Sequence, residues 1–256
     1  MKHLWRSLVV ACHLLWLGLL SGVAAQPVPV SVWVYHDFAP FVVDAEREAG
    51  LSFELAEALT ERSDGQYSFT VQVVNRMRLN LWLAQERKGL VFWANSAWFE
   101  DSGKTRYLWS GALMRDRNVL VSRQDNPVEF QDPTSLIGLH MAGVSGHRYT
   151  GIDPLIAKDR VRKTELRSEK QVMQFVASGR ADVAILPISA AVSYTDELEL
   201  RDSIYFADNP HSLYVREILV HRDLADVHSY VQMVLPEILT SATWQAAMQR
   251  YSVTDR

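Results

Sequence analysis

The sequence predicts an α/β protein made of two units, each a mainly parallel sheet flanked by helices. Short apolar, β-branched runs alternate with segments of helical periodicity along the chain, and parallel strands joined by crossover helices produce that order. The chain has 256 residues, of which 48% are hydrophobic and 22% charged, enough for one large core or two smaller ones. Two units of about 100 residues each fit this order.

The first unit opens with a strand in residues 28–41, where alternating β-branched and aromatic residues stop at Pro40. The following segment, 51–62, places its apolar residues on one helical face and its acids on the other. The patterns further along predict a strand over 67–74, a helix over 79–87, a buried strand over 89–95 and another strand over 118–123.

The second unit repeats the same order of elements. Its patterns predict a turn at Asp132-Pro133, a strand and glycine turn over 136–146, a helix over 169–179 and a buried strand over 179–187. A further strand is expected in residues 205–222. The tail from Asp223 is predicted to be helical, with Pro236 near a helix start or a kink.

Residues 1–25 have the composition of a cleaved secretory signal peptide. Basic residues precede an apolar run, and small residues lead to a cleavage site after Ala25. An uncleaved membrane anchor is the first alternative, although the apolar run falls short of the roughly 20 residues that a spanning helix needs. The second alternative is a lipoprotein anchor at Cys12, the only cysteine of the chain. The sequence therefore predicts an exported protein without disulfide bonds.

Charge and motif content exclude several function classes. The formal charge is −4, and no block of five like charges indicates a nucleic-acid or anionic-membrane surface. The histidines lack the spacing of a metal site, and no nucleophile motif such as GxSxG occurs. We therefore expect no metal, no cofactor and no enzymatic activity, and a small molecule or a protein as partner.

Four motifs, in order, carry a resemblance to a known family. They are Phe38-Ala39-Pro40-Phe41, the segment GLSFELA at 50–56, the turn at 135–146, and Gly179-Arg180-Ala181-Asp182 before a strand. In this order and spacing they resemble the bacterial periplasmic solute-binding proteins of the amino-acid ABC-transporter type (family 3). The resemblance covers nearly all of residues 28–250.

The resemblance implies the type II periplasmic-binding-protein fold, with two lobes joined by two hinge strands and a ligand held between them. Lobe 1 would comprise residues 26–115 plus 214–256, and residues 116–213 would form lobe 2. The implied protein is a periplasmic monomer that captures a small polar or amino-acid-like ligand. It would deliver that ligand to an inner-membrane ABC permease or to a sensor.

The two charged ligand anchors of the family are missing from their usual positions. The family's arginine, which grips a carboxylate, aligns with Phe99 or Gly103, depending on the direction of counting. Its aspartate, which takes an ammonium group, aligns with Pro187 at the end of the strand GRADVAILP. Proline can neither pair with an ammonium nor donate a backbone hydrogen bond. A degenerate family member that acts through protein contacts, as an accessory or signalling module, is therefore the alternative function.

The candidate cleft is instead aromatic and partly basic, which suits a larger, anionic or ring-stacked cationic ligand. Arg76 could equally be a surface residue at a helix start, and Arg106 could serve only if its loop is rebuilt. The backbone of Ser145 to His147 could present N–H groups to an anion at a helix start. The predicted ligand-binding residues are Tyr35, Phe38, Phe41, Arg76, Trp98, Arg106, Ser145, Gly146, His147 and Arg148.

Overall fold

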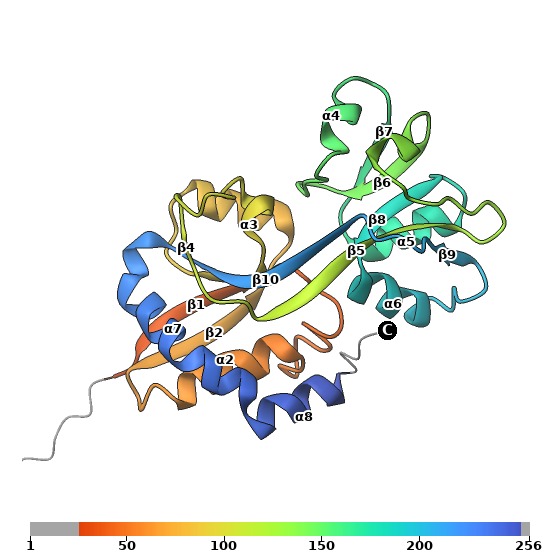
Figure 1. Ribbon diagram of the computed structural model, residues 1–256. Helices are drawn as coiled ribbons and strands as arrows, with labels where there is room; N and C mark the ends of the chain where they lie inside the picture. Colours follow the sequence, from red (N-terminus) through yellow and green to blue (C-terminus); the bar gives the residue numbers. More distant parts are fainter. Residues whose placement is uncertain (1–25, 252–256) are drawn as a thin grey trace, which may run out of the picture.

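A computed structural model describes residues 26–251, which form two lobes joined by two long strands (Figure 1). The strands follow the order β2-β1-β3-β10-β5-β8-β6-β7, with β4 paired to β10 and β9 paired to β5. The predicted signal peptide, its cleavage site and Cys12 lie outside the described residues. The two-lobed α/β fold class expected from the sequence is confirmed.

The first lobe contains the N-terminal half of the chain and its C-terminal helices. In it β1 pairs in parallel with both β2 and β3. Its elements are β1 (Val28–Val34), α2 (Leu51–Glu61), β2 (Tyr67–Val73), α3 (Arg76–Ala84), β3 (Leu90–Ala94), the short helix Ser96–Phe99, β4 (Leu108–Trp109), the short helix Arg222–Leu224, α7 (Ala225–Thr240) and α8 (Ala242–Arg250).

The second lobe is built around β6, which pairs in parallel with β7 and β8. Its elements are the short helix Pro133–Leu136, β6 (His140–Val144), α4 (Asp153–Ile156), β7 (Arg162–Leu166), α5 (Glu169–Ala177), β8 (Val183–Pro187), α6 (Ile188–Glu197) and β9 (Ile204–Phe206).

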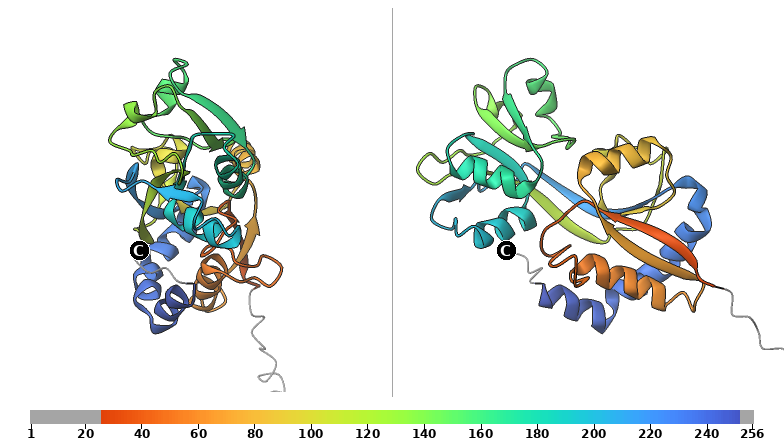
Figure 2. Two further views of the ribbon diagram at one scale, coloured as in Figure 1. Left: turned by 90° about the vertical axis from the view of Figure 1, so that its right-hand side faces the viewer. Right: turned by 180° about the vertical axis from the view of Figure 1, so that it is seen from behind.

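Two antiparallel strands, β5 (Met114–Arg123) and β10 (Ser212–Val220), belong to both lobes. The C-terminal part of β10 pairs with β3 and β4, whereas its N-terminal part pairs with β5. Strand β5 in turn pairs with β8 and β9 of the second lobe. Seen from behind, this ribbon is the connection between the two lobes (Figure 2).

Several elements differ from the sequence expectations. Residues 205–222 belong to two strands, β9 and β10, instead of one. In the segment between them, the N–H groups of Ala207 and His211 donate to the Leu120 and Asn118 carbonyls of β5. Helix α3 begins at Arg76 rather than at 79, because the Asn75 side chain accepts a hydrogen bond from the Arg78 N–H at 2.8 Å. The sequence patterns also missed β4, α4, β7 and α6.

Pro187 ends β8, and α6 starts at the next residue. Its φ of −53° matches the value that the proline ring imposes. The proline has no N–H, and an N–H at the start of a helix would have no acceptor within that helix. Backbone geometry therefore accounts for a proline at this position.

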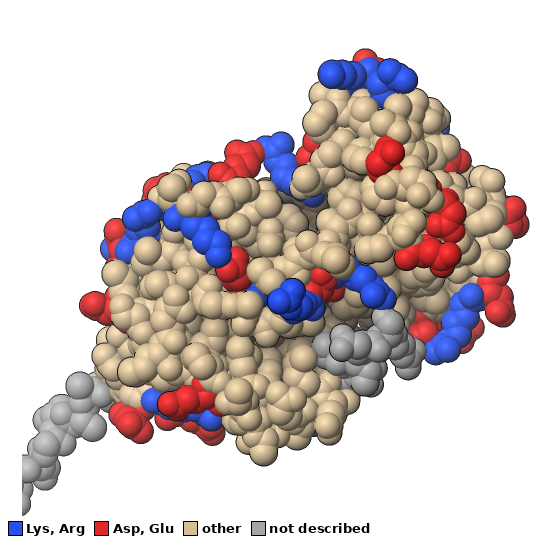
Figure 3. Space-filling view, in the orientation of Figure 1, with Lys and Arg blue, Asp and Glu red and all other residues tan. Residues whose placement is uncertain are grey.

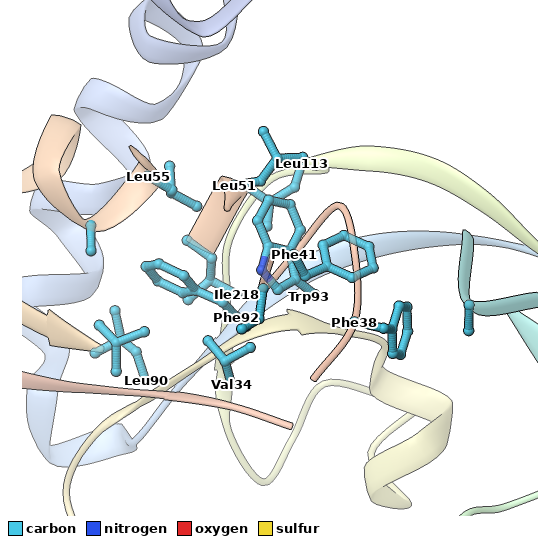
Figure 4. Close-up of a cluster of buried hydrophobic side chains, with 14 of the residues drawn as sticks. Val34, Phe38, Phe41, Leu51, Leu55, Leu90, Phe92, Trp93, Leu113 and Ile218 are labelled. Carbon is cyan, nitrogen blue, oxygen red and sulfur yellow. The ribbon is translucent and has the colours of Figure 1, made fainter. Parts of the chain in front are cut away.

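Trp93 is fully buried in the first lobe's core, within the strand that the sequence predicts to be buried (Figure 4). Its indole N–H donates to the Ser52 hydroxyl at 2.8 Å, and its ring stacks on Trp244. Its φ of 62° is unusual for a bulky residue and coincides with a register shift in the facing β10 between Glu217 and Leu219. The irregular pairing leaves the Trp93 carbonyl free to accept a hydrogen bond from Arg216 of β10.

Candidate ligand-binding cleft

A cavity of about 460 Å³ lies between the two lobes. The first lobe contributes the loop after β1, the end of β2 and the start of α3; the second contributes the end of β6, the start of α5, and α6. This volume suits a small ligand. The polar and aromatic side chains of its wall are Tyr35, Asp37, Phe38, Asn75, Arg76, His147, Arg167, Ser168, Glu169, Lys170, Ser193, Tyr194 and Glu197.

The lobes contact each other in two places. Beside this cavity the Tyr194 hydroxyl donates to the Asp37 carbonyl at 2.9 Å, and the rings of Phe38 and Tyr194 lie 6.1 Å apart. An exposed ion pair joins Arg148 to Glu100, which both line a smaller cavity. The face of the molecule in Figure 3 is hollowed between the lobes, with basic side chains at the edge. A ligand in the cavity would therefore contact both lobes at once.

Arg76 is a buried wall residue of the cavity, with 5% of its surface exposed. Its Nε donates to Asn80 at 2.9 Å, and one Nη donates to the Trp98 carbonyl at 2.6 Å. The guanidinium lies 4.9 Å from the ring centre of Tyr35 and 4.3 Å from that of Phe99. Burial lowers its pKa. Within residues 26–251 no carboxylate forms an ion pair with it, and Glu169, across the same cavity, acts on its charge only through space.

Glu169 is the first residue of α5 and is 5% exposed. Its Oε1 is buried and has no hydrogen-bond partner in the part of the chain that the structure describes. Burial raises the pKa of this carboxyl to about 7; Asp37 also raises it, while the helix N–H, Arg216 and Arg76 oppose the shift. The sequence analysis missed Glu169, because an acid after the capping Ser168 is an ordinary way to begin a helix.

A second buried network lies next to the cavity, between the two hinge strands. Arg216 of β10 is fully buried, and its Nε donates to the Asp116 carboxylate of β5 at 2.7 Å. It also donates to the Trp93 carbonyl at 3.0 Å and to His36 Nε2 at 2.9 Å, and it lies over the Phe41 ring. Burial and Arg216 hold the pKa of His36 well below its usual value, so His36 is a neutral acceptor. Sequence reasoning missed this network; an arginine inside the apolar strand VREILV was its only signal.

The predicted ligand-binding residues fall into separate places. Phe41 is fully buried in the core, and Ser145 is half-buried and donates its N–H to Leu166. A small cavity of about 40 Å³ is lined by Trp98, Arg148 and Pro187 among others, and a third, of about 210 Å³, by Arg106, Gly146 and Arg148. Of the predicted residues, Tyr35, Phe38, Arg76 and His147 line the large cavity, and all of these except Phe38 also line the small one.

The expectation of an anion site at a helix start near Ser145 is wrong. No helix begins there, since the next one, α4, starts at Asp153 and has four residues. The Ser145 N–H donates to the Leu166 carbonyl at 2.8 Å, and the His147 N–H to the Val144 carbonyl at 3.1 Å. Burial, together with nearby Arg76, lowers the pKa of His147 to about 3. This loop therefore contributes a neutral ring to the cavity.

The loop that would carry the family's arginine is rebuilt around Asp101. The Asp101 carboxylate accepts hydrogen bonds from the N–H groups of Thr105, Arg106 and Tyr107 and from the Trp109 indole, at 2.7 to 3.1 Å. Burial opposes ionisation, but these donors outweigh it and lower the pKa of Asp101. Gly103 and the Arg106 side chain are left exposed, and neither lines the large cavity.

Within residues 26–251 no group of three or more His, Cys, Asp or Glu side chains is placed to hold a metal ion. No helix in that range has the length and apolar character needed to cross a membrane.

Comparisons with known proteins identify the fold. An ancestral arginine-binding protein bound to arginine superposes with a TM-score of 0.73 at 14% identity, over 88% of this chain and 98% of that protein. A mutant arginine-binding protein of T. maritima gives 0.71 at 18% identity, over 87% and 94%. This chain has the fold of amino-acid-binding proteins. The substrate-binding protein of an amino acid ABC transporter gives 0.68 at 16% identity, over 89% and 100%.

No protein-family model and no curated protein matches the sequence itself. At identities this low, the likeness to these binding proteins establishes the two-lobed fold. The resemblance expected from the sequence is confirmed at that level.

Proposed function

We propose that this chain is a solute-binding protein that captures a small polar or amino-acid-like ligand between its lobes. One observation carries the proposal: among residues 26–251 the cavity between the lobes is walled by a buried guanidinium that forms no ion pair, Arg76, and by a buried carboxyl with an unpartnered oxygen, Glu169. Buried charges are costly unless they are paired, and a ligand can supply the missing partners.

The cellular setting is part of the same proposal. A structural neighbour described as the substrate-binding protein of an amino acid ABC transporter supports an assignment to that family and delivery to an ABC permease or a sensor. We propose a periplasmic monomer released by cleavage after Ala25. Its lobe 1 comprises residues 26–115 plus 214–256, and residues 116–213 form its lobe 2.

The alternative is an accessory module that has lost ligand capture. Its basis is the absence of the family's arginine and aspartate at Gly103 and Pro187. The cavity argues against it, because a module that binds only proteins has no need for buried charged groups in the wall of a cleft between its lobes. We also propose that the ligand is bound without turnover. The described wall holds charged and aromatic side chains that can bind a ligand, and none of its hydroxyl groups is paired with a base that would make it a nucleophile.

A ligand screen by thermal unfolding tests the proposal. The chain from residue 26 is heated with amino acids, polyamines, dicarboxylates, sugars and aromatic acids. A true ligand at 100 times its dissociation constant adds about 2.7 kcal/mol of stability. Calorimetry of a hit should give one site per chain, and the ligand should be recovered unchanged. A folded protein that no compound stabilises would favour the accessory role, and a chemically altered ligand would indicate an enzyme.

A further inference from the structure

We infer that the small cavity of about 40 Å³ beside the hinge strands is a binding site for a monatomic anion, chloride. The inference goes beyond the proposed function, because it assigns a second site that does not depend on the solute. Residues of both lobes and of both hinge strands line this cavity, so an anion in it would contact all four parts at once.

The volume of the small cavity limits its occupant. A cavity holds a water molecule once it offers about 10–15 Å³, so about 40 Å³ accommodates a few waters or one small ion. A whole amino acid or sugar needs the neighbouring cavity of about 460 Å³. Tyr35, Arg76 and His147 line both cavities, whereas His36, Asn118 and Ser212 are among the residues that line only the small one.

Two buried hydrogen-bond donors in the wall of the small cavity have no partner. The side chains of Tyr35 and His36 belong to residues that are 4% and 1% exposed, and the Tyr35 hydroxyl and His36 Nδ1 form no hydrogen bond with residues 26–251. Arg216 donates to His36 Nε2 at 2.9 Å, and because a guanidinium has no acceptor, Nε2 must accept. The neutral ring therefore carries its proton on Nδ1. Buried donors are costly when unpaired, and one acceptor in the cavity would satisfy both.

The charges around the small cavity favour a negative occupant. Arg76 and Arg148 line it, and no Asp or Glu of residues 26–251 does. Arg148 is paired with Glu100, whereas Arg76 forms no ion pair in that range. Glu169 acts on Arg76 across the large cavity, but burial raises the pKa of this carboxyl to about 7, so it is partly protonated near neutral pH. A small anion would therefore be a close counter-ion of Arg76.

The histidines of the wall respond to the same positive charges. Burial, Arg216 and Arg76 hold the pKa of His36 well below its usual value. Burial and Arg76 lower the pKa of His147 to about 3. Both rings are therefore neutral, and a cation in the cavity would be repelled by the two guanidinium groups that keep them so.

The other polar side chains of the wall already have partners. Asn118 of β5 donates to the Ser212 hydroxyl of β10 at 3.1 Å, which joins the two hinge strands. His211 Nε2 lies 2.9 Å from the Thr150 carbonyl of the second lobe. The Tyr35 hydroxyl and the His36 Nδ1–H are the donors that an anion would use.

The test measures the stability of the chain from residue 26, without added solute, in sodium chloride and in sodium gluconate at matched ionic strength and neutral pH. Gluconate is too large for the small cavity, so the two series share the screening by salt and differ in the anion that can enter. A bound anion raises the folding equilibrium constant by the factor 1 + [L]/Kd. Chloride at ten times its dissociation constant should therefore raise it about 11-fold over gluconate.

Removing a group of the site should weaken this effect. Tyr35→Phe keeps the ring and removes the hydroxyl, and Arg76→Met removes the charge. Each should raise the dissociation constant of chloride by about 10- to 150-fold, the value of one hydrogen bond to a charged group. Tyr67→Phe and Arg78→Met are the matched controls, because Tyr67 is buried in β2, Arg78 is exposed on α3, and neither lines the cavity. Both should leave the chloride effect within twofold.

Crystals grown in sodium bromide provide a second measurement, since anomalous scattering locates the ion directly. We expect a bromide peak within hydrogen-bond distance of the Tyr35 hydroxyl and His36 Nδ1, and this peak and Tyr35→Phe decide the matter if Arg76→Met does not fold. Equal stability of the parent in chloride and gluconate, or a chloride effect that Tyr35→Phe leaves unchanged, would overturn the inference and indicate that the cavity holds only water. The proposed function would stand in that case, because no solute enters this test.

Discussion

Replacing Asp116 by alanine leaves Arg216 charged and buried between the lobes. The side chains of this pair are 0% and 3% exposed, and Nε lies 2.7 Å from Oδ2. Removing one partner of a buried ion pair costs about 3–5 kcal/mol, because the remaining charge stays in an apolar surrounding. For a protein of this size each kcal/mol corresponds to about 2–4 °C in Tm, so we expect Asp116→Ala to unfold about 6–20 °C lower.

The assay is thermal unfolding followed by circular dichroism, with a double-mutant cycle. Asp125→Ala is the control, since it removes the exposed partner of Arg123, and exposed ion pairs contribute little. Arg216→Met in the Asp116→Ala background removes the unpaired charge and should recover a large part of the lost stability. If Asp116→Ala costs no more than Asp125→Ala, or Arg216→Met recovers nothing, then Arg216 is solvated and the reasoning fails.

Three further predictions concern the cleft. The pKa of Glu169, about 7 in the fold against its usual 4.5, means that the folded chain binds this proton more tightly than the unfolded chain. Unfolding free energy therefore falls by about 3 kcal/mol as pH rises from 4.5 to above 7, and Glu169→Gln should be more stable than the parent at pH 8 but not at pH 4.5 in urea titrations. Tyr194→Phe removes the bond to Asp37, worth about 0.5–1.5 kcal/mol, and should lower ligand affinity by up to about tenfold in calorimetry; unchanged affinity would show that this contact does not hold the lobes together. Gly146→Ala should lower the unfolding free energy by about 1–2 kcal/mol, because the φ of 79° at this position is one that L residues rarely adopt; an unchanged Tm in thermal unfolding would contradict this.

The sequence patterns predicted the α/β class, and the resemblance of four motifs to a known family implied the two-lobed arrangement. The periodicity of residues 51–62, the buried strand 89–95 and the glycine after α5 report local backbone preferences, which act over a few residues and appear directly in the pattern. The elements that the sequence patterns did not predict are short or lack a clear apolar alternation. Strand β7, with the sequence RKTEL, is an example. Such elements form because neighbouring strands bind them.

The site could be predicted only in part, because its chemistry depends on burial by distant segments. Arg76 was recognised as a candidate, but its burial results from the Trp98 carbonyl and the Phe99 ring, which belong to a later segment of the chain. In the sequence Glu169 is an ordinary acid at a helix start and Arg216 a single base inside an apolar strand, and their environment is created by the other lobe and by the facing hinge strand. The side chains of Phe41 and Arg106 have suitable chemistry, yet the core encloses the first and the Asp101 turn directs the second to the surface.

The loss of the family's two anchors has a structural counterpart in this chain. Asp101 takes up the N–H groups of the loop around Gly103, which prevents that loop from presenting a cation to the cleft. Arg76, one helix away, is held beside the same loop through the Trp98 carbonyl. On the other lobe, Pro187 starts α6, and α6 carries Tyr194 to the first lobe while α5 carries Glu169 into the cavity. The wall of the cavity therefore has a buried guanidinium on the first lobe and a buried carboxyl on the second.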